Sequence, residues 1–486
     1  MSTPNIIFFI TDQERRERHW PAGWSETNLP TLQRLKKNGL TFNHYIAAAC
    51  ECSPSRASMM TSTYPQENGV TVTFATPLNP STVNLAAVLD AVKIPLYWKG
   101  KWHLSHPLSG NEFSWSASDI ANVASLYNVL AWNPPDAGNS LGSDFQTLGA
   151  GVGMNDARFV TGSPAGPISA QSAIECIQSY DPSSGPFCLV VSLVNPHDVW
   201  VYPQYLSQSG YTLAQFQNAG ISLPSNLHDD LLTKPCAQLE FRKSYAHVPD
   251  ADRLNYVNFY AWLHTLSDAL FGQVMDALDT AGLTDDTIIF RFADHGEMGL
   301  SHGLQEKMYT AYEEAINVPL IISNPKLFPS PMVTNELASG IDIAPTVAAL
   351  CNSTTTSTLR GVSLVPLFTS PSSPVRKHAI YTFDDQFGIS SGATHIRCIR
   401  TKEWKYAVYL SDNPTGTNVF EYELYDLAHD PGELTNLAFG TVTPATLTQW
   451  TKLHAQLTSE LRSVAALPNI TDWPAAPPTS WTRCPS

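Results

Sequence analysis

Four short apolar runs, each leading directly into polar residues, constrain the fold of this chain more than any other feature. They are NIIFFI (5–10), IPLYW (94–98), FCLVVSLV (187–194) and TIIFRFA (287–293). Such runs are typical of strands that a parallel sheet buries on both faces. Helical patterns lie between them, most clearly at 251–280, where apolar residues recur at spacings of three and four before Gly282. Strands alternating with helices predict an α/β fold with a mostly parallel central sheet flanked by helices.

A Ser/Pro-rich stretch, TSPSSPVRKH (369–378), indicates a domain boundary. After it come the alternating segments KHAIYTF, HIRCIRT, KYAVYL and EYELYDL, which predict an antiparallel sheet, and a helical pattern at about 443–466. A chain of 486 residues is too long for one compact core of ordinary size. We therefore expect a larger α/β domain at 1–370 and a smaller α+β domain with a tail at 371–486.

Charge and the amino-terminal sequence limit the partners and the compartment. The chain has 28 Lys and Arg against 43 Asp and Glu, a formal net charge of −15. Such a field repels nucleic acid and anionic membranes, so neither is expected as a partner, and an anionic substrate should be small. The sequence starts without a signal-peptide pattern, contains no stretch near the ~20 apolar residues of a membrane span, and scatters its cysteines. These features predict a cytoplasmic protein with reduced thiols.

Each predicted strand ends in residues that can carry chemistry. The polar residues that follow the four runs, in chain order, are Asp12 and Gln13; Lys99, Lys101 and His103; His197 and Asp198; and Asp294 and His295. Singly, each has a plainer interpretation as a helix cap, a turn or a solvated lysine. Sites in open α/β sheets form outside the carboxyl ends of the strands. The set together therefore predicts one convergent site.

Four of these residues have the chemistry of a cation site. Asp12, Gln13, Asp294 and His295 would supply oxygen ligands and one imidazole nitrogen. Oxygen ligands suit Ca²⁺, Mg²⁺ or Mn²⁺, and the imidazole disfavours Ca²⁺, but the identity of the metal stays open. With only two carboxylates, a bound dication is merely neutralised and can still polarise an anionic ester.

The stretch AAACECSPSRASMMTS (47–62) predicts an anion-binding helix start. A helix beginning near Pro54 would turn its free N–H groups toward the site. Arg56 adds a planar fork that suits sulfate or phosphate oxygens. A cysteine here is either a nucleophile or an inert buried thiol, and physical chemistry alone does not choose.

These motifs together resemble the formylglycine-dependent (type I) sulfatases of the alkaline-phosphatase superfamily. The resemblance extends from the first strand to YDLAHDPGELTNL (425–437). The family's modification signal is cysteine, any residue, proline or alanine, any residue, arginine. Cys52 fits it, as CSPSR, and Cys50 does not. The resemblance implies an alkaline-phosphatase-like catalytic domain at 1–370, and oxidation of Cys52 to formylglycine by a formylglycine-generating enzyme, followed by hydration to a geminal diol.

The resemblance also implies the ligands and the nucleophile. Asp12, Gln13, Asp294 and His295 match the metal ligands, and the modified Cys52 completes the coordination sphere. One diol hydroxyl would attack the sulfur atom, assisted by the metal and by Asp294. The implied cofactors are therefore one divalent metal ion and the formylglycine itself.

The remaining catalytic residues match the family in the same way. Arg56 would hold the altered residue and its developing charge. Lys101, in GKWH, and Lys307, in HGLQEKMYTAYEE, would bind the sulfate oxygens. His197 would contact the substrate and protonate the leaving oxygen, and His103 would deprotonate the second hydroxyl, which expels sulfate and restores the aldehyde.

Two positions depart from the commonest sulfatase pattern. Gln13 and His295 stand where that pattern has an aspartate and an asparagine, and the combination resembles phosphonate monoester hydrolases and choline sulfatases. The GKWH motif is instead a sulfatase feature, and Thr73 stands where both of those subgroups carry asparagine. We expect an arylsulfatase-type sulfuric ester hydrolase. Phosphonate monoester or phosphodiester hydrolysis is the alternative, or a promiscuous side activity, and an inactive anion-binding protein is disfavoured by the intact catalytic set.

The expected partners are a small aryl or alkyl sulfate ester and, during maturation, the formylglycine-generating enzyme. Similar family members form dimers or tetramers, so the segment at 468–486 is either an arm reaching a second copy in a homo-oligomer or an unordered tail. Several aromatic residues near the motifs are interpreted either as substrate contacts or as loop and core residues. They are His106, His302, Trp115, Trp132 and Trp200.

Overall fold

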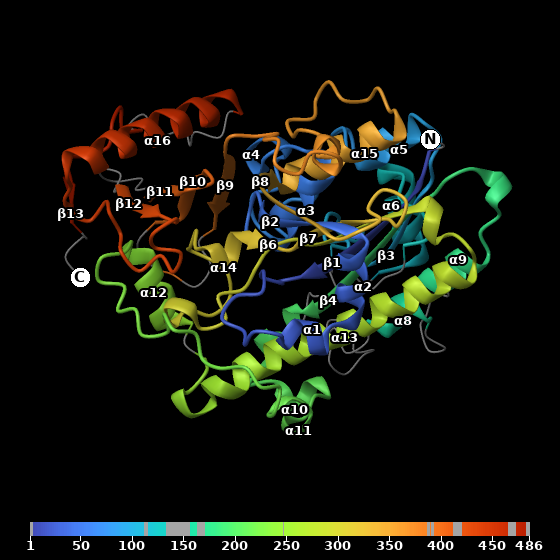
Figure 1. The fold of residues 1–486 in the computed structure, drawn as a ribbon, viewed down its shortest axis with the longest axis horizontal. Coiled ribbons are helices and arrows are strands. Elements are labelled where there is room, and N and C mark those ends of the chain that lie inside the picture. Colours follow the sequence, from blue (N-terminus) through green and yellow to red (C-terminus); the bar gives the residue numbers. More distant parts are fainter. Residues whose placement is uncertain are drawn as a thin grey trace.

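The chain forms two sheets, one mostly parallel and one antiparallel, that lie side by side (Figure 1). A computed structural model describes residues 3–110, 115–132, 156–162, 171–245, 247–385, 389, 393–411, 420–464 and 473–482. The predicted fold class, a helix-flanked α/β sheet with a smaller antiparallel sheet toward the carboxyl end, is confirmed.

The four predicted strands form the centre of the larger sheet. Its order is β3-β4-β1-β5-β7-β2-β6, with β8 paired to β2. The parallel strands are β1 (Asn5–Asp12), β3 (Leu96–Gly100), β4 (Cys188–Pro196) and β5 (Thr287–Ala293). The other strands are β2 (Gly39–Ile46), β6 (Asn317–Val318), β7 (Leu320–Ser323) and β8 (Met332–Ser339), and β7 runs antiparallel to β5. All residues of β1 are buried, as expected for a strand covered on both faces.

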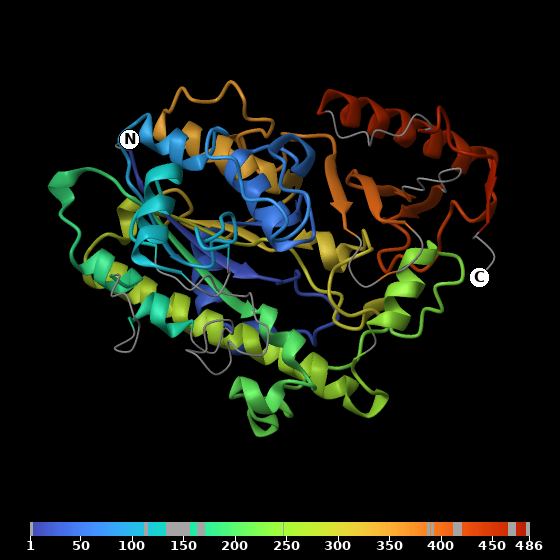
Figure 2. The same cartoon turned by 180° about the vertical axis from the view of Figure 1, so that it is seen from behind.

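Alternate residues of β1 enter two different cores. Ile6, Phe8 and Ile10 belong to the core beneath the helices α3 (Cys52–Thr61), α5 (Leu85–Asp90) and α15 (Ile343–Cys351). Ile7 and Phe9 face α13 (Arg253–Thr280) and α2 (Pro30–Lys37) on the opposite face, where Phe9 stacks on Phe271 at 4.4 Å between ring centroids. Seen from behind, α13 spans the full width of the sheet (Figure 2).

The remaining helices of this part are short connectors. They are α1 (Trp24–Asn28), α4 (Pro65–Asn68), α6 (Ala117–Tyr127), α8 (Ala157–Val160), α9 (Ala173–Gln178), α10 (Leu206–Ser209), α11 (Leu213–Phe216), α12 (Cys236–Ser244) and α14 (Glu313–Ile316). Among the described residues, no helix combines the length and apolarity that crossing a bilayer requires.

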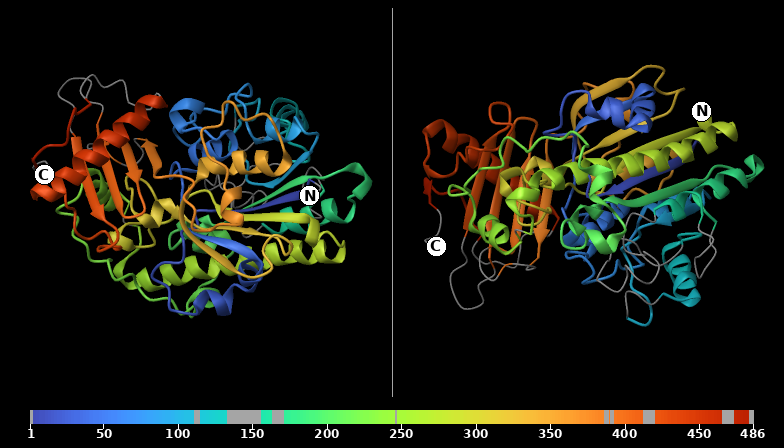
Figure 3. Two further views of the ribbon diagram at one scale, coloured as in Figure 1. Left: turned by 45° about the horizontal axis from the view of Figure 1, so that its top comes forward. Right: turned by 90° about the horizontal axis from the view of Figure 1, so that it is seen from below.

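The smaller sheet has the order β12-β11-β10-β9 and is antiparallel throughout. Its strands are β9 (Ala379–Asp384), β10 (His395–Arg400), β11 (Trp404–Leu410) and β12 (Phe420–Asp426). The helix α16 (Pro444–Ser463) lies along these strands at one end of the molecule (Figure 3) and buries Trp450, Leu453, Leu457 and Leu461. A two-stranded ribbon joins β13 (Gly440–Thr441) to β14 (Ser480–Trp481).

The predicted tail at 468–486 is described only at 473–482. That part packs on its own chain, because the indole of Trp473 donates to Thr458 on α16 at 2.9 Å and Trp481 is buried. The flanking residues lie outside the described part of the chain.

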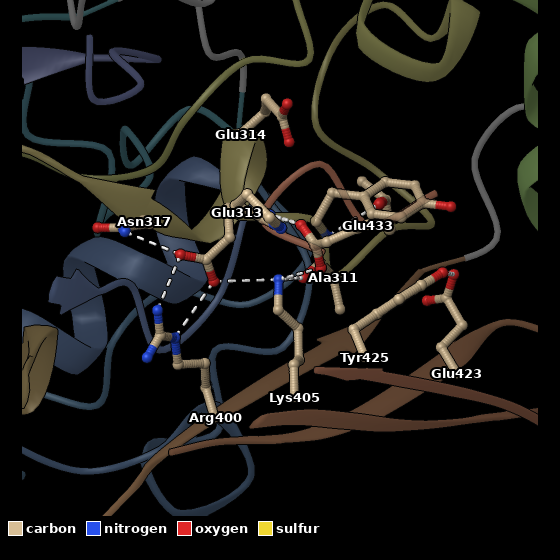
Figure 4. Close-up of polar contacts among 12 residues, drawn as sticks. Ala311, Glu313, Glu314, Asn317, Arg400, Lys405, Glu423, Tyr425 and Glu433 are labelled. Carbon is tan, nitrogen blue, oxygen red and sulfur yellow. Dashed lines mark hydrogen bonds and ion pairs between the residues drawn. The ribbon is translucent and has the colours of Figure 1, made fainter. Parts of the chain in front are cut away.

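A buried ionic network joins the smaller sheet to α14 (Figure 4). The ammonium of Lys405 lies 3.1 Å from Glu313 and 2.6 Å from Glu433, and it donates to the carbonyl of Ala311 at 2.7 Å. Arg400 adds contacts of 3.3 and 3.2 Å to the Glu313 carboxylate. Burial alone would raise the pKa of Glu313, but Arg400 and Lys405 hold it well below its usual range. These ionic contacts therefore connect the two sheets across the proposed boundary at 370, which itself stays a prediction.

Candidate active site

The parallel strands deliver the predicted residues to one edge of the sheet. Asp12 is the last residue of β1, and Asp294 and His295 follow β5 directly. Possible ligand atoms of Asp12, Cys52, Asp294 and His295 all lie within 4.8 Å of one another, and all four residues are buried. Residues separated by more than 280 positions in the sequence thus meet in one group.

Cys52 occupies the first position of α3, two residues earlier than the predicted start. Its Sγ lies 3.2 Å from Nε2 of His295 and 3.7 Å from Oδ1 of Asp12. Burial and Asp12 raise the pKa of the Cys52 thiol, but Lys101, His295 and Lys307 outweigh them and lower it. The helix start and the surrounding cations together favour negative charge at this position.

Cys50 has different surroundings although it lies only two residues away. It accepts a hydrogen bond from the hydroxyl of Tyr381 at 2.8 Å, and it is not part of the ligand group. Burial raises the pKa of its thiol. Burial therefore disfavours the thiolate form of Cys50.

Arg56 lies one turn further along α3 and is fully buried. Its Nε contacts Oδ2 of Asp294 at 2.9 Å, and one terminal nitrogen lies 3.5 Å from Asp12. The other terminal nitrogen donates to the carbonyl of Lys101 and to the hydroxyl of Ser192, each at 2.9 Å. The guanidinium thus connects the ends of β1, β3, β4 and β5. The sequence offered no signal for Ser192, a serine inside an apolar strand.

A glycine lets β3 approach β4 closely before Lys101. Gly100 has a φ of +91°, and a Cβ added there would meet the carbonyl oxygen of Ser192 at 1.9 Å. The backbone N–H of Lys101 donates to that same carbonyl at 2.9 Å. This close approach directs the Lys101 side chain to Asp12, with which its ammonium forms a buried ion pair.

Both predicted lysines remain positively charged. Burial lowers the pKa of Lys101, but Asp12 and Cys52 outweigh it and raise the value. Lys307 donates to Oε1 of Gln13 and lies 3.0 Å from Glu306, and its pKa is raised well above the usual value despite burial. Together with Arg56, these ammonium groups form a cationic surround that suits an anion next to Cys52.

Of the two predicted catalytic histidines, His103 is buried and His197 half-buried, and the pKa of each is shifted toward the neutral form. Burial, with Lys101 and Arg56, holds the pKa of His103 well below its usual value. Burial, with Lys101 and Lys307, does the same to His197 despite the opposing effect of Asp12. Nδ1 of His197 has no hydrogen-bond partner in the described part of the chain, whereas the ring of His103 contacts that of Phe74 edge-on at 4.0 Å. Neutral imidazoles are able to accept protons.

The ligand group fits a divalent cation. Nδ1 of His295 faces the carbonyl of Gly296 at 3.1 Å, and a carbonyl only accepts, so Nδ1 carries the hydrogen. Burial lowers the pKa of His295, but Asp294 and Cys52 outweigh it and raise the value. In the neutral form of His295, Nε2 presents its lone pair toward the carboxylates, 3.5 Å from Asp12 and 3.8 Å from Asp294. A ligating histidine typically has this arrangement. Two carboxylates and one imidazole suit Mg²⁺ or Mn²⁺. They suit Ca²⁺ less well, because Ca²⁺ prefers oxygen ligands to an imidazole nitrogen.

Two of the other candidate substrate contacts, His302 and Trp132, pack against residues of the fold. His302 stacks on Tyr312 at 3.8 Å and contacts Asp229 at 2.7 Å. The indole of Trp132 is buried, donates to Gly100 and packs edge-on against Trp115. Two half-buried candidates lie nearer the site. The ring centroid of Trp200 is 6.4 Å from that of His197, and that of His106 is 6.5 Å from that of Phe74, which contacts His103.

Three buried carboxyl groups next to the site were not predicted. Glu297 and Glu306 both accept hydrogen bonds from the amide of Gln13. Asp156 accepts from the backbone N–H groups of Val194 and Asn195, at the end of β4 and just before His197. The only available signal for Glu297 was its place in DHGE after a strand.

Comparison with known proteins identifies the family. A family model described as "Sulfatase" matches residues 4–353, and a model described as "N-sulphoglucosamine sulphohydrolase, C-terminal" matches residues 300–465. The chain is 26% identical to choline-sulfatase of Rhizobium meliloti (strain 1021), over 93% of this chain and 86% of that protein. It is 24% identical to N-acetylglucosamine-6-O-sulfatase of Bacteroides thetaiotaomicron, over 89% and 82%.

A solved structure shares the fold at lower sequence similarity. The phosphonate monoester hydrolase of Silicibacter pomeroyi has a TM-score of 0.70 and 21% identity, and the match covers 98% of this chain and 100% of that chain. The predicted resemblance and the enzyme class, sulfuric ester hydrolase, are confirmed at the level of the family. The chain belongs to the sulfatase family.

Proposed function

We propose that this chain hydrolyses a small aryl or alkyl sulfate monoester to the phenol or alcohol and inorganic sulfate. The nucleophile would be hydrated formylglycine derived from Cys52. One observation carries the proposal: Cys52 begins a buried helix at the carboxyl edge of the sheet, where, despite burial, Lys101 and Lys307 lower the pKa of its thiol.

The metal would be held by Asp12, Gln13, Asp294 and His295. A divalent cation there supplies positive charge that stabilises the anionic ester as it reacts. Hydrated formylglycine would supply two hydroxyls, one as the nucleophile toward sulfur and one whose deprotonation lets sulfate leave. Installing it requires a formylglycine-generating enzyme during maturation, because the protein is synthesised with a thiol at position 52.

The other residues bind the ester and move its protons. Lys101 and Lys307 hold the sulfate oxygens, and Arg56 fixes residue 52 against Asp294. As the bond between sulfur and the leaving oxygen breaks, His197 gives that oxygen a proton. An anionic substrate beside His197 favours the charged imidazole and so offsets the effect of burial on its pKa. His103, neutral in the resting site, takes the proton whose removal expels sulfate.

A second candidate function is phosphonate monoester or phosphodiester hydrolysis at the same site. It is favoured by the ligand set, in which Gln13 and His295 replace the aspartate and asparagine of the commonest sulfatases. A promiscuous side activity on these esters is compatible with the main proposal, because the cations around Cys52 suit phosphonate and sulfate oxygens alike.

The two candidates are separated by kcat/KM for an aryl sulfate and for the matching aryl phosphonate monoester. The protein is co-produced with a formylglycine-generating enzyme, and mass spectrometry verifies that residue 52 has lost sulfur and two hydrogens and gained one oxygen. We expect a ratio well above one in favour of sulfate, no activity in Cys52→Ala, and retained activity in the matched control Cys50→Ala. A ratio below one assigns the chain to phosphonate hydrolysis, and equal activity in Cys52→Ala refutes both candidates.

A further inference from the structure

The side chain of Gln13 is held by two buried carboxylates. Its Nε2 donates to Oε2 of Glu297 at 2.6 Å and to Oε2 of Glu306 at 3.0 Å. Gln13 and Glu297 are fully buried, and Glu306 is nearly so. An amide NH₂ has two hydrogens, and here each has its own acceptor.

The two carboxylates are themselves fixed. Oε1 of Glu297 accepts from the hydroxyl of Tyr256 at 2.8 Å and from the backbone N–H groups of Gly299 and Glu306, at 2.9 and 3.0 Å. Only Oε2 of Glu297 therefore remains for Gln13. Oε2 of Glu306 is shared between Gln13 and the ammonium of Lys307 at 3.0 Å.

These contacts determine the orientation of the Gln13 amide. A rotated amide would turn its oxygen toward Oε2 of Glu306, which already accepts from Lys307, and its NH₂ group toward the ammonium of Lys307, which only donates. In the observed orientation the oxygen faces Lys307, which also donates to it. The oxygen is then the one atom of the amide that a cation can bind.

We propose that Glu297 and Glu306 are positioning residues that fix Gln13 so that its oxygen, and not its NH₂ group, is presented to the divalent cation. This inference deepens the proposed function and rests on the cation site within it. It also accounts for an amide at position 13: a carboxylate there would face two others across buried hydrogen-bond distances, whereas an NH₂ group satisfies both.

The test reverses the polarity of one hydrogen bond. In Glu297→Gln the new amide keeps its oxygen on the three donors that now contact Oε1, so its NH₂ group opposes the NH₂ group of Gln13. The conflict is relieved when Gln13 rotates and turns NH₂ toward the cation. In the double variant Gln13→Glu, Glu297→Gln the donor and acceptor of that bond are exchanged at unchanged formal charge, and an oxygen again faces the cation. The new carboxylate still meets Oε2 of Glu306, so the expected recovery is partial.

Glu314→Gln is the matched control. Glu314 is a buried glutamate from the same region, but its side chain contacts His19 at 2.9 Å and Asn226 at 3.5 Å and does not contact Gln13. A purely structural role for Glu297 predicts similar behaviour for the two single variants, namely a lower unfolding temperature with unchanged cation affinity.

Calorimetric titration of Mn²⁺ into the metal-free full-length protein, co-produced with a formylglycine-generating enzyme, measures the affinity. We expect Glu297→Gln to bind Mn²⁺ about 10- to 100-fold more weakly, Glu314→Gln to match wild type, and the double variant to recover part of the loss. The unfolding temperature of metal-free Glu297→Gln should stay near that of wild type, while its gain on adding Mn²⁺ shrinks.

Each other outcome is decisive. Wild-type affinity in Glu297→Gln, or a double variant that binds no better than Glu297→Gln, overturns the inference and leaves the proposed function standing. A wild-type protein that binds none of Mn²⁺, Mg²⁺ and Ca²⁺ overturns the metal-dependent proposal and the inference with it. If Glu297→Gln does not fold alone, restored folding and Mn²⁺ binding in the double variant support the inference, and their absence contradicts it.

Discussion

Replacing Lys405 with methionine isolates the energy of the ionic network between the two sheets. The ammonium of Lys405 contacts Glu313, Glu433 and the carbonyl of Ala311, and Lys405 is almost fully buried. In Lys405→Met, Glu313 keeps Arg400, so the uncompensated charge falls on Glu433 (Figure 4). Burial already raises the pKa of Glu433, against the opposing effect of Lys405.

Two limits set the expected loss in the free energy of unfolding of Lys405→Met. Breaking a buried pair by removing one partner typically destabilises by about 3–5 kcal/mol. Glu433 escapes the penalty by taking up a proton, and neutralising a carboxyl of pKa about 4.3 at pH 7 costs at most ~3.7 kcal/mol. We therefore expect a loss of about 3–4 kcal/mol at pH 7.

The pH dependence has a definite sign. In Lys405→Met the pKa of Glu433 is raised further in the folded state, so the stability of the variant relative to wild type falls as pH rises. The deficit should shrink by about 1.4 kcal/mol for each pH unit below 7, until Glu433 is protonated in the unfolded chain as well. Urea unfolding followed by tryptophan fluorescence at pH 7 and at lower pH measures this slope.

Two further variants complete the design. Lys405→Met, Glu433→Gln removes the orphaned charge and should recover most of the loss. Arg34→Ala breaks solvent-exposed pairs with Asp276, at 2.7 Å, and with Asp279, and should cost no more than about 1 kcal/mol. A Lys405→Met loss as small as that of Arg34→Ala, or a deficit that does not change with pH, would refute this account of the network.

The remaining predictions concern the support of His197 and the cation site. Asp156→Ala should lower kcat/KM by up to ~100-fold, because the two N–H groups at the end of β4 lose their acceptor and His197 shifts. Asp156→Asn should retain activity. Burial raises the pKa of Asp156 to about 8, so the folded wild-type protein loses stability as pH rises toward that value and favours ionisation of this carboxyl group, and the Asp156→Asn variant should not show that loss in urea unfolding. Wild-type protein with Mn²⁺ at 100 times its dissociation constant should gain about 2.7 kcal/mol over chelator-treated protein in urea unfolding; no gain would contradict a cation site that forms on folding.

The central strands were predictable because burial on both faces leaves a continuous apolar signal. The run at 5–10 became β1, and the run at 287–293 became β5 with identical bounds. β2 was not predicted, since its sequence GLTFNHYI mixes polar residues into a strand that is only partly buried. β7 has four residues, too short to separate from a loop by periodicity.

Site residues that come just after a strand could be predicted from the sequence. Site residues that are buried only by contacts distant in the sequence could not. Asp12 and His197 each stand directly beyond an apolar run, so the carboxyl ends of the strands indicate their convergence. Glu297 and Glu306 carry no such signal, because glutamate is usually solvated and their burial depends on an amide 284 and 293 residues away. Only the folded arrangement shows why these two carboxylates are buried.

The charges of the site make cation and anion binding interdependent. Around Cys52, buried cationic groups and carboxylates balance in pairs. They are Lys101 with Asp12, Arg56 with Asp294, and Lys307 with Glu306. A divalent cation added to this balanced set leaves excess positive charge in a buried region, and an anionic ester removes that excess. Each ligand should therefore strengthen the binding of the other by the same factor. This arrangement reconciles the proposed anion site with a net charge of −15: the negative field of the chain acts at long range, while an anion bound next to Cys52 would meet Lys101 and Lys307 locally.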